Sequence, residues 1–449
     1  MRHIDSLIHA GWIVPVEPEG VVLKDHAVAI RGGEILSVLP MQEADQRYLP
    51  EARHSFPNHV LIPGLINAHT HAAMTLFRGM ASDLPLMPWL HEHIWPAETR
   101  WLSEEFVYDG ARLAVAEMLR GGVTCFNDMY FFPDEVARAA LDAGIRAVLG
   151  LIILDLSTVW AVNGAEYLAK GREVHDRYRQ ETLIRTALAP HAPYSVSDAS
   201  LEQVGILADE LDIPIHMHVH ETIDEINHSL EQHKERPLAR IRRLGLLSPR
   251  LLAVHMTHLD ETDLQSFFAS GAYVAHCPES NLKLASGLCP VERLMDAGVT
   301  VALGTDGCAS NDDLDMLGEM RAATLLAKGM ANSASSLPAA RVLGMATLDG
   351  AKALGLGDTI GSLRPGKAAD IVAIDLDTIE TQPVYDPISQ LVYAANRQQV
   401  TDVWVAGRQV LQGRVLTGLD VAETIRRARA WGLGLRDWRE VKFSISRNG

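Results

Sequence analysis

The chain has 449 residues and a mass of 49.2 kDa, which is too long for one small domain and suits a large barrel with a smaller unit. Hydrophobic residues make up 47% and charged residues 22%, a balance that excludes disordered, collagen-like and coiled-coil chains. The 40 basic and 57 acidic residues give a formal charge of −17, which repels phosphate backbones and argues against nucleic acid or an anionic membrane as partner.

The cysteines and the hydrophobicity profile bear on the compartment. None of the four cysteines stands in a C-x-x-C pair, so a cysteine zinc site or redox motif is not indicated, and scattered thiols in a long chain favour a reducing compartment. The first residues lack a basic region followed by a long apolar run, and no window approaches about 18 consecutive apolar residues. We therefore expect a cytoplasmic protein without a signal peptide or transmembrane helix.

Short strands separated by turn residues are expected at both ends of the chain. The N-terminal strands are predicted at residues 6–16, 21–31 and 35–40, and the C-terminal strands at residues 370–375, 400–405 and 409–411. Two β-rich ends around a different middle predict one small β-sandwich domain formed by residues 1–57 and 365–449.

The middle, residues 58–364, alternates apolar strand-like runs with amphipathic helical stretches. The eight runs are residues 59–67, 122–127, 145–154, 183–190, 213–219, 251–255, 272–277 and 300–304. Helices are predicted at residues 104–120, 134–143, 165–179, 201–211, 261–269, 291–297, 313–327 and 339–354. This alternation requires parallel strands with crossover helices and predicts an α/β fold with a (β/α)8 TIM-like barrel. A doubly wound open sheet is the rival, but the first run lacks its GxGxxG turn.

Histidines and acidic residues close these runs, where a barrel holds its catalytic residues. The first run continues into His69 and His71, which alternate along an extended chain, so both imidazoles can face one cation, although an isolated His-x-His pair is more often structural. His218 on the fifth run and Asp306 after the eighth complete a three-histidine, one-carboxylate set that suits zinc or iron. His220 is the alternative third ligand, and His216 is expected to lie deeper in the barrel as a structural residue.

Three residues near this predicted metal site have acid–base chemistry. Asp306 is expected to bind the metal and take a proton from water, the alternative being a helix cap. His255 is expected to orient that water, the alternative being a core histidine, and Glu221 to lie over the metal, the alternative being a solvated carboxylate. No lysine ends the fourth run, so we expect one metal ion per chain and no binuclear site.

These residues resemble the motifs of the amidohydrolase superfamily over nearly the whole chain. The similar segments are PGLINAHTH at 63–71, HVHE at 218–221, the run ending at His255, GTDG at 304–307 and GKAAD at 366–370. Within the superfamily the chain is similar to the aminohydrolases of adenosine-like and triazine substrates. The likeness is greatest to deaminases of 5′-methylthioadenosine and S-adenosylhomocysteine, on MPWL at 87–90, WPAE at 95–98, APHAPY at 189–194, HCPESN at 276–281 and GTDGCASN at 304–311.

The resemblance implies hydrolytic deamination of an adenine ring to the inosine analogue and ammonia, with one divalent metal ion, Zn²⁺ or alternatively Fe²⁺. Glu221 would donate a proton to purine N1. Glu98 would accept hydrogen bonds from the two ribose hydroxyls, since one carboxylate fits a vicinal diol. His191 would contact the purine and Trp89 would form a wall of the pocket. The structural alternatives are a carboxylate at a helix end for Glu98, an imidazole that caps a strand for His191 and a core aromatic residue for Trp89.

The resemblance leaves the substrate open. Related enzymes that act on S-adenosylhomocysteine can hold its carboxylate with arginines, and residues 154–170 offer none, so we expect 5′-methylthioadenosine and adenosine to be preferred. A guanine, cytosine or s-triazine aminohydrolase or chlorohydrolase is the alternative enzyme, and Glu98 discriminates because a free base has no diol. A non-catalytic scaffold would be expected to lack ligands. The expected partner is a small-molecule nucleoside, with a homodimer as the default assembly.

Overall fold

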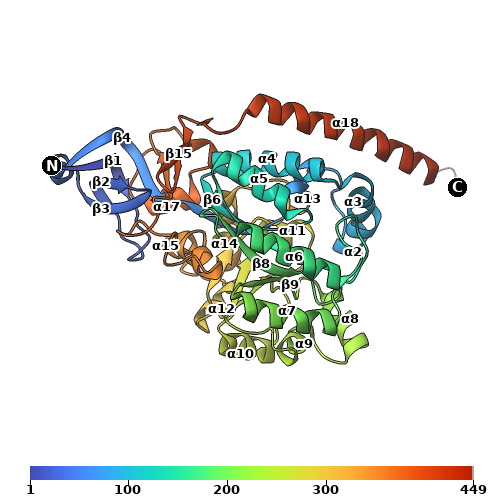
Figure 1. Cartoon of the computed structure of the whole chain (residues 1–449). Helices are drawn as coiled ribbons and strands as arrows, with labels where there is room; N and C mark the ends of the chain where they lie inside the picture. Colours follow the sequence, from blue (N-terminus) through green and yellow to red (C-terminus); the bar gives the residue numbers. More distant parts are fainter. Residues whose placement is uncertain (447–449) are drawn as a thin grey trace.

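Two eight-stranded sheets organise the chain in the computed structural model, which describes residues 1–446 and the side chains of residues 1–438 (Figure 1). One sheet is parallel and rolls into a nearly closed barrel, and the other is mixed and takes strands from both ends of the chain. The predicted α/β fold, with a (β/α)8 barrel and a small β unit from both termini, is confirmed. No helix among the described residues is long and apolar enough to cross a membrane.

The barrel strands follow one another in chain order, each hydrogen-bonded in parallel to the next. They are β5 (Leu65–Thr70), β6 (Val123–Tyr130), β7 (Arg146–Ile153), β8 (Ile184–Pro190), β9 (Ile215–Val219), β10 (Leu251–His255), β11 (Tyr273–His276) and β12 (Val301–Leu303). A 3.0 Å hydrogen bond from Asp306 N–H to the carbonyl of His69 joins the chain after β12 to β5. The ends of the first and last strands therefore meet at the mouth of the barrel.

The first predicted run, residues 59–67, is wrong in one respect, because it spans strands of both sheets. Its first part belongs to β4 (Tyr48–Pro63) of the mixed sheet, and β5 begins only at Leu65. Gly64 separates them, and a Cβ at Gly64 would lie 1.9 Å from Oγ1 of Thr124. Glycine is therefore required where the chain passes from one sheet to the other. Residues on both sides of Gly64 are buried, so the apolar pattern does not reveal the change.

Helices surround the barrel, and the predicted ones are present with small shifts at their ends. Those that follow β5 to β12 are α4 (Glu104–Arg120), α5 (Pro133–Ala143), α6 (Gly164–Tyr178), α7 (Asp198–Leu211), α8 (Ile223–His233), α9 (Pro237–Arg243), α10 (Glu261–Ser270), α11 (Pro278–Lys283), α12 (Val291–Asp296), α13 (Cys308–Asn311), α14 (Met316–Ala331), α15 (Ala339–Met345) and α16 (Leu348–Ala353). The predicted helix at 339–354 is thus two helices. α4 begins where expected because the Ser103 side chain accepts a hydrogen bond from Phe106 N–H and caps it.

The mixed sheet has the strand order β16-β15-β14-β13-β4-β1-β2-β3. Its further strands are β1 (Arg2–Ile13), β2 (Leu23–Arg31), β3 (Glu34–Pro40), β13 (Ile371–Asp375), β14 (Val400–Val405), β15 (Arg408–Gln412) and β16 (Val415–Leu416), with α1 (Met41–Arg47), α17 (Pro387–Tyr393) and η3 (Arg397–Gln399) beside them. β4 pairs in parallel with β1 and antiparallel with β13, so it joins the two ends of the chain. The domain division at residues 57 and 365 stays a prediction.

Two peripheral parts were not predicted. After β5 the chain forms η1 (Ala72–Phe77), α2 (Leu86–Trp89), η2 (Leu90–Ile94) and α3 (Trp95–Trp101), and Figure 1 shows α2 and α3 at the end of the barrel away from the mixed sheet. The C-terminal α18 (Val421–Ser446) reaches toward α3 along the outside. Arg427 Nε and Trp431 Nε1 both donate to Asp109 on α4, at 2.7 and 2.9 Å, and anchor this helix.

Candidate metal centre and active site

Four predicted ligands meet at the barrel mouth. They come from β5, the residue after it, β9 and the turn after β12: His69, His71, His218 and Asp306. One ligand atom from each lies within 4.8 Å of the others. Nε2 of His69 and Nε2 of His71 are each 3.2 Å from Oδ1 of Asp306, and Nε2 of His218 is 3.2 Å from Nε2 of His69.

The outer partners of the three rings determine which nitrogen faces the centre. Each Nδ1 has such a partner: Met129 O for His71 at 2.6 Å, His191 O for His218 at 2.8 Å and His216 Nε2 for His69 at 2.8 Å. A carbonyl only accepts hydrogen bonds, so Nδ1 of His71 and of His218 carries the hydrogen and Nε2 presents a lone pair. The Nε2 lone pairs of His71 and His218 and the carboxylate oxygen of Asp306 thus lie close together as electron-pair donors, an arrangement that a cation between them stabilises. The donor set therefore fits a divalent metal ion of the zinc or iron type.

His216 and His220, the other two histidines of the predicted fifth run and its end, have partners outside the ligand set. His216 on β9 lies behind His69 and contacts its Nδ1. His220 Nδ1 is 3.1 Å from the carbonyl of His258, and its Nε2 accepts a 3.1 Å hydrogen bond from Leu238 N–H. Both ring nitrogens of His220 are thus occupied away from the centre, and the geometry favours His218 as the third ligand.

Asp306 is held in its charged form by its surroundings. Burial opposes its charge, but the close contacts with the rings of His69 and His71 outweigh burial and hold the pKa of the carboxyl well below its usual range. Its Oδ2 accepts hydrogen bonds from the hydroxyls of Ser280 and Ser310, each at 2.7 Å. These bonds leave Oδ1 directed at the histidines. Neither serine was predicted as a site residue, although both lie in segments that carry the family resemblance.

Glu221 and His255 lie side by side at the ends of β9 and β10. Glu221 is 6% exposed, and burial raises the pKa of its carboxyl above its usual value. Its Oε1 lies 3.9 Å from Nε2 of His255. Nδ1 of His255 is 2.8 Å from Oδ1 of Asn281, an acceptor, so Nδ1 carries the hydrogen and Nε2 has the free lone pair. A carboxyl able to hold a proton therefore stands beside a group able to accept one.

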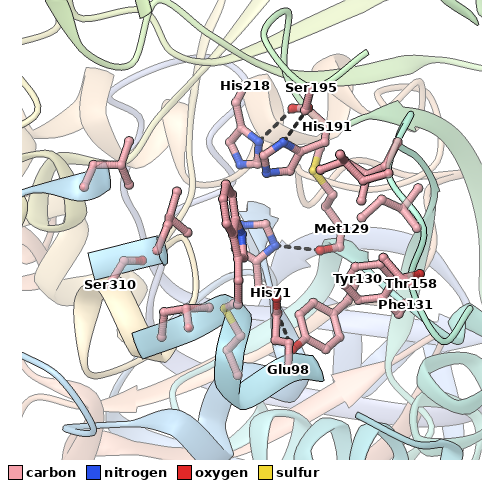
Figure 2. A pocket seen from close by; sticks show the side chains of 18 of the residues that line it. His71, Glu98, Met129, Tyr130, Phe131, Thr158, His191, Ser195, His218 and Ser310 are labelled. Carbon is pink, nitrogen blue, oxygen red and sulfur yellow. Dashed lines mark hydrogen bonds between the residues drawn. The ribbon is translucent and has the colours of Figure 1, made fainter. Parts of the chain in front are cut away.

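A cavity of about 540 Å³ covers this centre (Figure 2). Its acidic lining residues are Glu98, Glu221 and Asp306, and among the described residues that line it none is lysine or arginine. The loop after β7 contributes the apolar side chains of Leu156 and Val159. Trp160 of the same loop does not line the cavity and packs against Phe132, with 5.1 Å between ring centroids.

Glu98 enters the cavity from α3, and Tyr130 at the end of β6 holds it. The Tyr130 hydroxyl donates to Oε1 of Glu98 at 2.8 Å (Figure 2). Burial raises the pKa of Glu98 to about 7, although the Tyr130 hydrogen bond acts in the opposite direction. Tyr130 was not predicted as a site residue, because nothing in its own strand shows that Glu98 of α3 lies within hydrogen-bond distance.

His191 and Trp89 also line the cavity. Nδ1 of His191 is 2.9 Å from Oγ of Ser195, so Nε2 is the nitrogen left for a ligand. Burial, followed by the charges of His71 and His69, lowers the pKa of His191 to about 3, so the ring is neutral at pH 7. Trp89 is 4% exposed, and its indole N–H has no partner among the described residues. A buried donor of this kind is available to a bound molecule.

Comparisons with known proteins agree with this architecture. The amidohydrolase family model matches residues 60–410. The 5-methylthioadenosine/S-adenosylhomocysteine deaminase of Teredinibacter turnerae is 49% identical over 428 residues, which are 95% of this chain and 97% of the relative. The protein of the same name from Saccharophagus degradans is 47% identical over 427 residues, 95% and 96% of the two chains. The crystal structure of an adenosine deaminase from Xanthomonas campestris with bound zinc is similar with a TM-score of 0.96 at 53% identity, covering 97% of this chain and 99% of that one.

Proposed function

The chain belongs to the amidohydrolase family, and on this premise we propose that it hydrolyses the adenine amino group of 5′-methylthioadenosine and adenosine. The products are the inosine analogue and ammonia. The observation that carries the proposal is that Glu221 and Glu98 line the same cavity as the convergent metal ligands. One carboxyl is thus available to the reacting ring and the other to a ribose.

Substrate binding follows from the polar groups of the cavity wall. Tyr130 occupies Oε1 of Glu98 and orients the carboxylate, whose other lone pairs are available to the 2′- and 3′-hydroxyls. His191 contacts the purine through Nε2, and Trp89 forms a wall that offers one N–H. These contacts place the adenine ring over Glu221 and the metal centre.

The reaction uses His69, His71, His218 and Asp306 as ligands of one divalent ion, Zn²⁺ or alternatively Fe²⁺, which when bound supplies the Lewis acidity that lowers the pKa of water to about 7. Nε2 of His255 and the carboxylate of Asp306 orient the attacking water and take its proton. Glu221, whose pKa is raised by burial, donates a proton to purine N1 and makes C6 electrophilic. The water oxygen adds at C6, and the proton taken from the water passes through Asp306 to the amino group. The C6–N bond then breaks, ammonia leaves, and the remaining C6–OH proton returns to Glu221 as the carbonyl forms.

The cavity lining supports a preference for an uncharged 5′ substituent. The methylthio group of 5′-methylthioadenosine is apolar, as are Leu156 and Val159. The amino-acid tail of S-adenosylhomocysteine carries a carboxylate, and the described lining residues include acidic groups but no cation to pair with it. Burying an unpaired carboxylate is costly, so S-adenosylhomocysteine is the poorest of the three substrates.

The partner and the compartment follow from simpler properties. The net charge of −17 favours a small nucleoside over nucleic acid or an anionic membrane surface. All four cysteines are buried and unpaired, which suits the reducing cytoplasm. A homodimer is the proposed assembly.

The test is ammonia release by purified protein whose metal content has been measured. Ammonia release from 5′-methylthioadenosine and adenosine but not from guanine is expected, together with no chloride release from atrazine. About one metal ion per chain without release from either nucleoside would overturn the proposed reaction. For substrate preference, kcat/KM for S-adenosylhomocysteine is expected to be at least about tenfold below that for 5′-methylthioadenosine, a difference of about 1.4 kcal/mol. Equal kcat/KM values for the two substrates would refute the proposed preference for an uncharged 5′ substituent.

A further inference from the structure

The turn that carries Glu221 has a strained backbone. It leads from β9 into α8, and His220, the residue before Glu221, has φ 55°. Residues other than glycine adopt such left-handed angles infrequently, and they persist where the surrounding structure holds them. The position of the Glu221 carboxyl therefore depends on the groups that hold this turn.

Glu225 holds the turn from the α8 side. Its side chain is 5% exposed, and its Oε1 accepts a 3.0 Å hydrogen bond from His220 N–H. Its Oε2 accepts a 2.8 Å hydrogen bond from Glu221 N–H. In an ordinary capping box the third helical residue reaches back to the N–H of the cap residue, which here is Thr222. Glu225 reaches past Thr222 to the two residues before it, so it does more than cap α8.

Thr257 holds the same turn from the opposite side. Its Oγ1 lies 2.9 Å from the carbonyl of His220 and 2.8 Å from the carbonyl of Glu221, so one hydroxyl hydrogen is shared between the two. Its own N–H donates to the carbonyl of His220 at 3.0 Å. Thr257 stands two residues after His255, so this contact also links the turn of Glu221 to the end of β10.

We infer that Glu225 and Thr257 are positioning residues that fix the backbone of Glu221 and thereby set the rate of the chemical step. Together they engage the N–H and C=O groups of both His220 and Glu221. Neither side chain lines the cavity, so neither touches the substrate. The inference rests on the proposed function, because it takes Glu221 to be the proton donor.

Matched substitutions separate positioning from general stability. Thr257→Val removes the hydroxyl at nearly constant shape, and Thr257→Ser retains it. Glu225→Gln leaves one acceptor and turns an NH₂ group toward a backbone N–H. Asp386→Ala is the control, because Asp386 accepts a 3.0 Å hydrogen bond from Ile388 N–H and caps α17, outside the site. Loss of this helix cap lowers the stability of the protein and leaves the contacts that hold the turn of Glu221 unchanged.

The first readout is steady-state kinetics with 5′-methylthioadenosine. Thr257→Val is expected to lower kcat by about 10- to 100-fold and Glu225→Gln by about tenfold, with KM within about threefold, because misplacing a reacting group affects the chemical step. Thr257→Ser is expected to recover most of kcat. Asp386→Ala is expected to lower Tm and leave kcat unchanged. If Thr257→Val and Glu225→Gln keep wild-type kcat, the inference is overturned.

The second readout is hydrogen exchange of the His220 and Glu221 amides, which needs no substrate. Faster exchange confined to this turn in Thr257→Val and Glu225→Gln supports the inference, and unchanged exchange overturns it. If the wild-type protein releases no ammonia while exchange responds as expected, the proposed function fails and the fixed backbone of Glu221 stands. The two failures are therefore distinguishable.

Discussion

Replacing Glu98 by alanine is expected to remove the binding of the ribose hydroxyls. Oε1 of Glu98 already accepts from Tyr130 at 2.8 Å, so the carboxylate is oriented before a substrate arrives. A hydrogen bond to a charged group contributes about 1.5 kcal/mol at the lower end of its range, and two such bonds contribute about 3 kcal/mol. At about 1.36 kcal/mol per tenfold change, Glu98→Ala should lower kcat/KM for adenosine about 150-fold.

The assay is a cycle of two proteins and two substrates. Wild-type and Glu98→Ala proteins are compared on adenosine and on 2′,3′-dideoxyadenosine, which lacks both hydroxyls. Removing either the carboxylate or the two hydroxyls should lower kcat/KM strongly, and removing both should lower kcat/KM little more than either change alone. Tyr130→Phe, which leaves the carboxylate but removes its donor, should reduce kcat/KM less than tenfold. An equal effect of Glu98→Ala on both substrates would refute the assignment of Glu98 to the diol.

Three further predictions concern the acid, the metal and pH. Glu221→Gln should lower kcat at least about 100-fold while the metal content stays that of wild type, and a loss below tenfold would exclude Glu221 as the proton donor. His71→Ala should lower the metal content measured by elemental analysis. A chelator should lower the Tm of the wild-type protein, and adding Zn²⁺ should restore it. A Tm that changes with neither the chelator nor Zn²⁺ would contradict the metal centre. Because burial raises the pKa of Glu98 to about 7, its carboxyl becomes protonated and accepts fewer hydrogen bonds below that pH. The kcat/KM ratio of adenosine to 2′,3′-dideoxyadenosine should therefore fall from pH 8 to pH 6, and Glu98→Gln should make it independent of pH.

Much of the barrel could be predicted from the sequence because its signals are local. The strand β10 has the bounds predicted for it, residues 251–255, and α4 has the predicted bounds 104–120. The hydrophobic periods of strands and helices involve neighbouring residues only, so they can be recognised without tertiary information. The polar residues at strand ends follow from the same pattern, since parallel strands of a barrel end at one mouth. His69, His71, His218 and Asp306 meet there for this reason.

The turn after β9 shows where local pattern fails. Strict alternation would direct His216, His218 and His220 to one face. The strand ends at Val219, and the left-handed backbone of His220 turns its ring toward His258 and Leu238. The alternation does not indicate that break, so it left His220 as an alternative to the predicted ligand His218, and the structure favours His218.

The barrel, the small β unit from both termini and the residue types at the mouth could be predicted because periodicity and strand ends are properties of short segments. Which of these segments lie in contact became known from the folded structure. Tyr130 and Glu98 come from β6 and α3 and meet only in the folded chain, and Thr257 reaches the turn of Glu221 because β9 and β10 are neighbours. Contacts between segments distant in sequence depend on how whole helices and strands pack, and the local sequence of either segment does not indicate them.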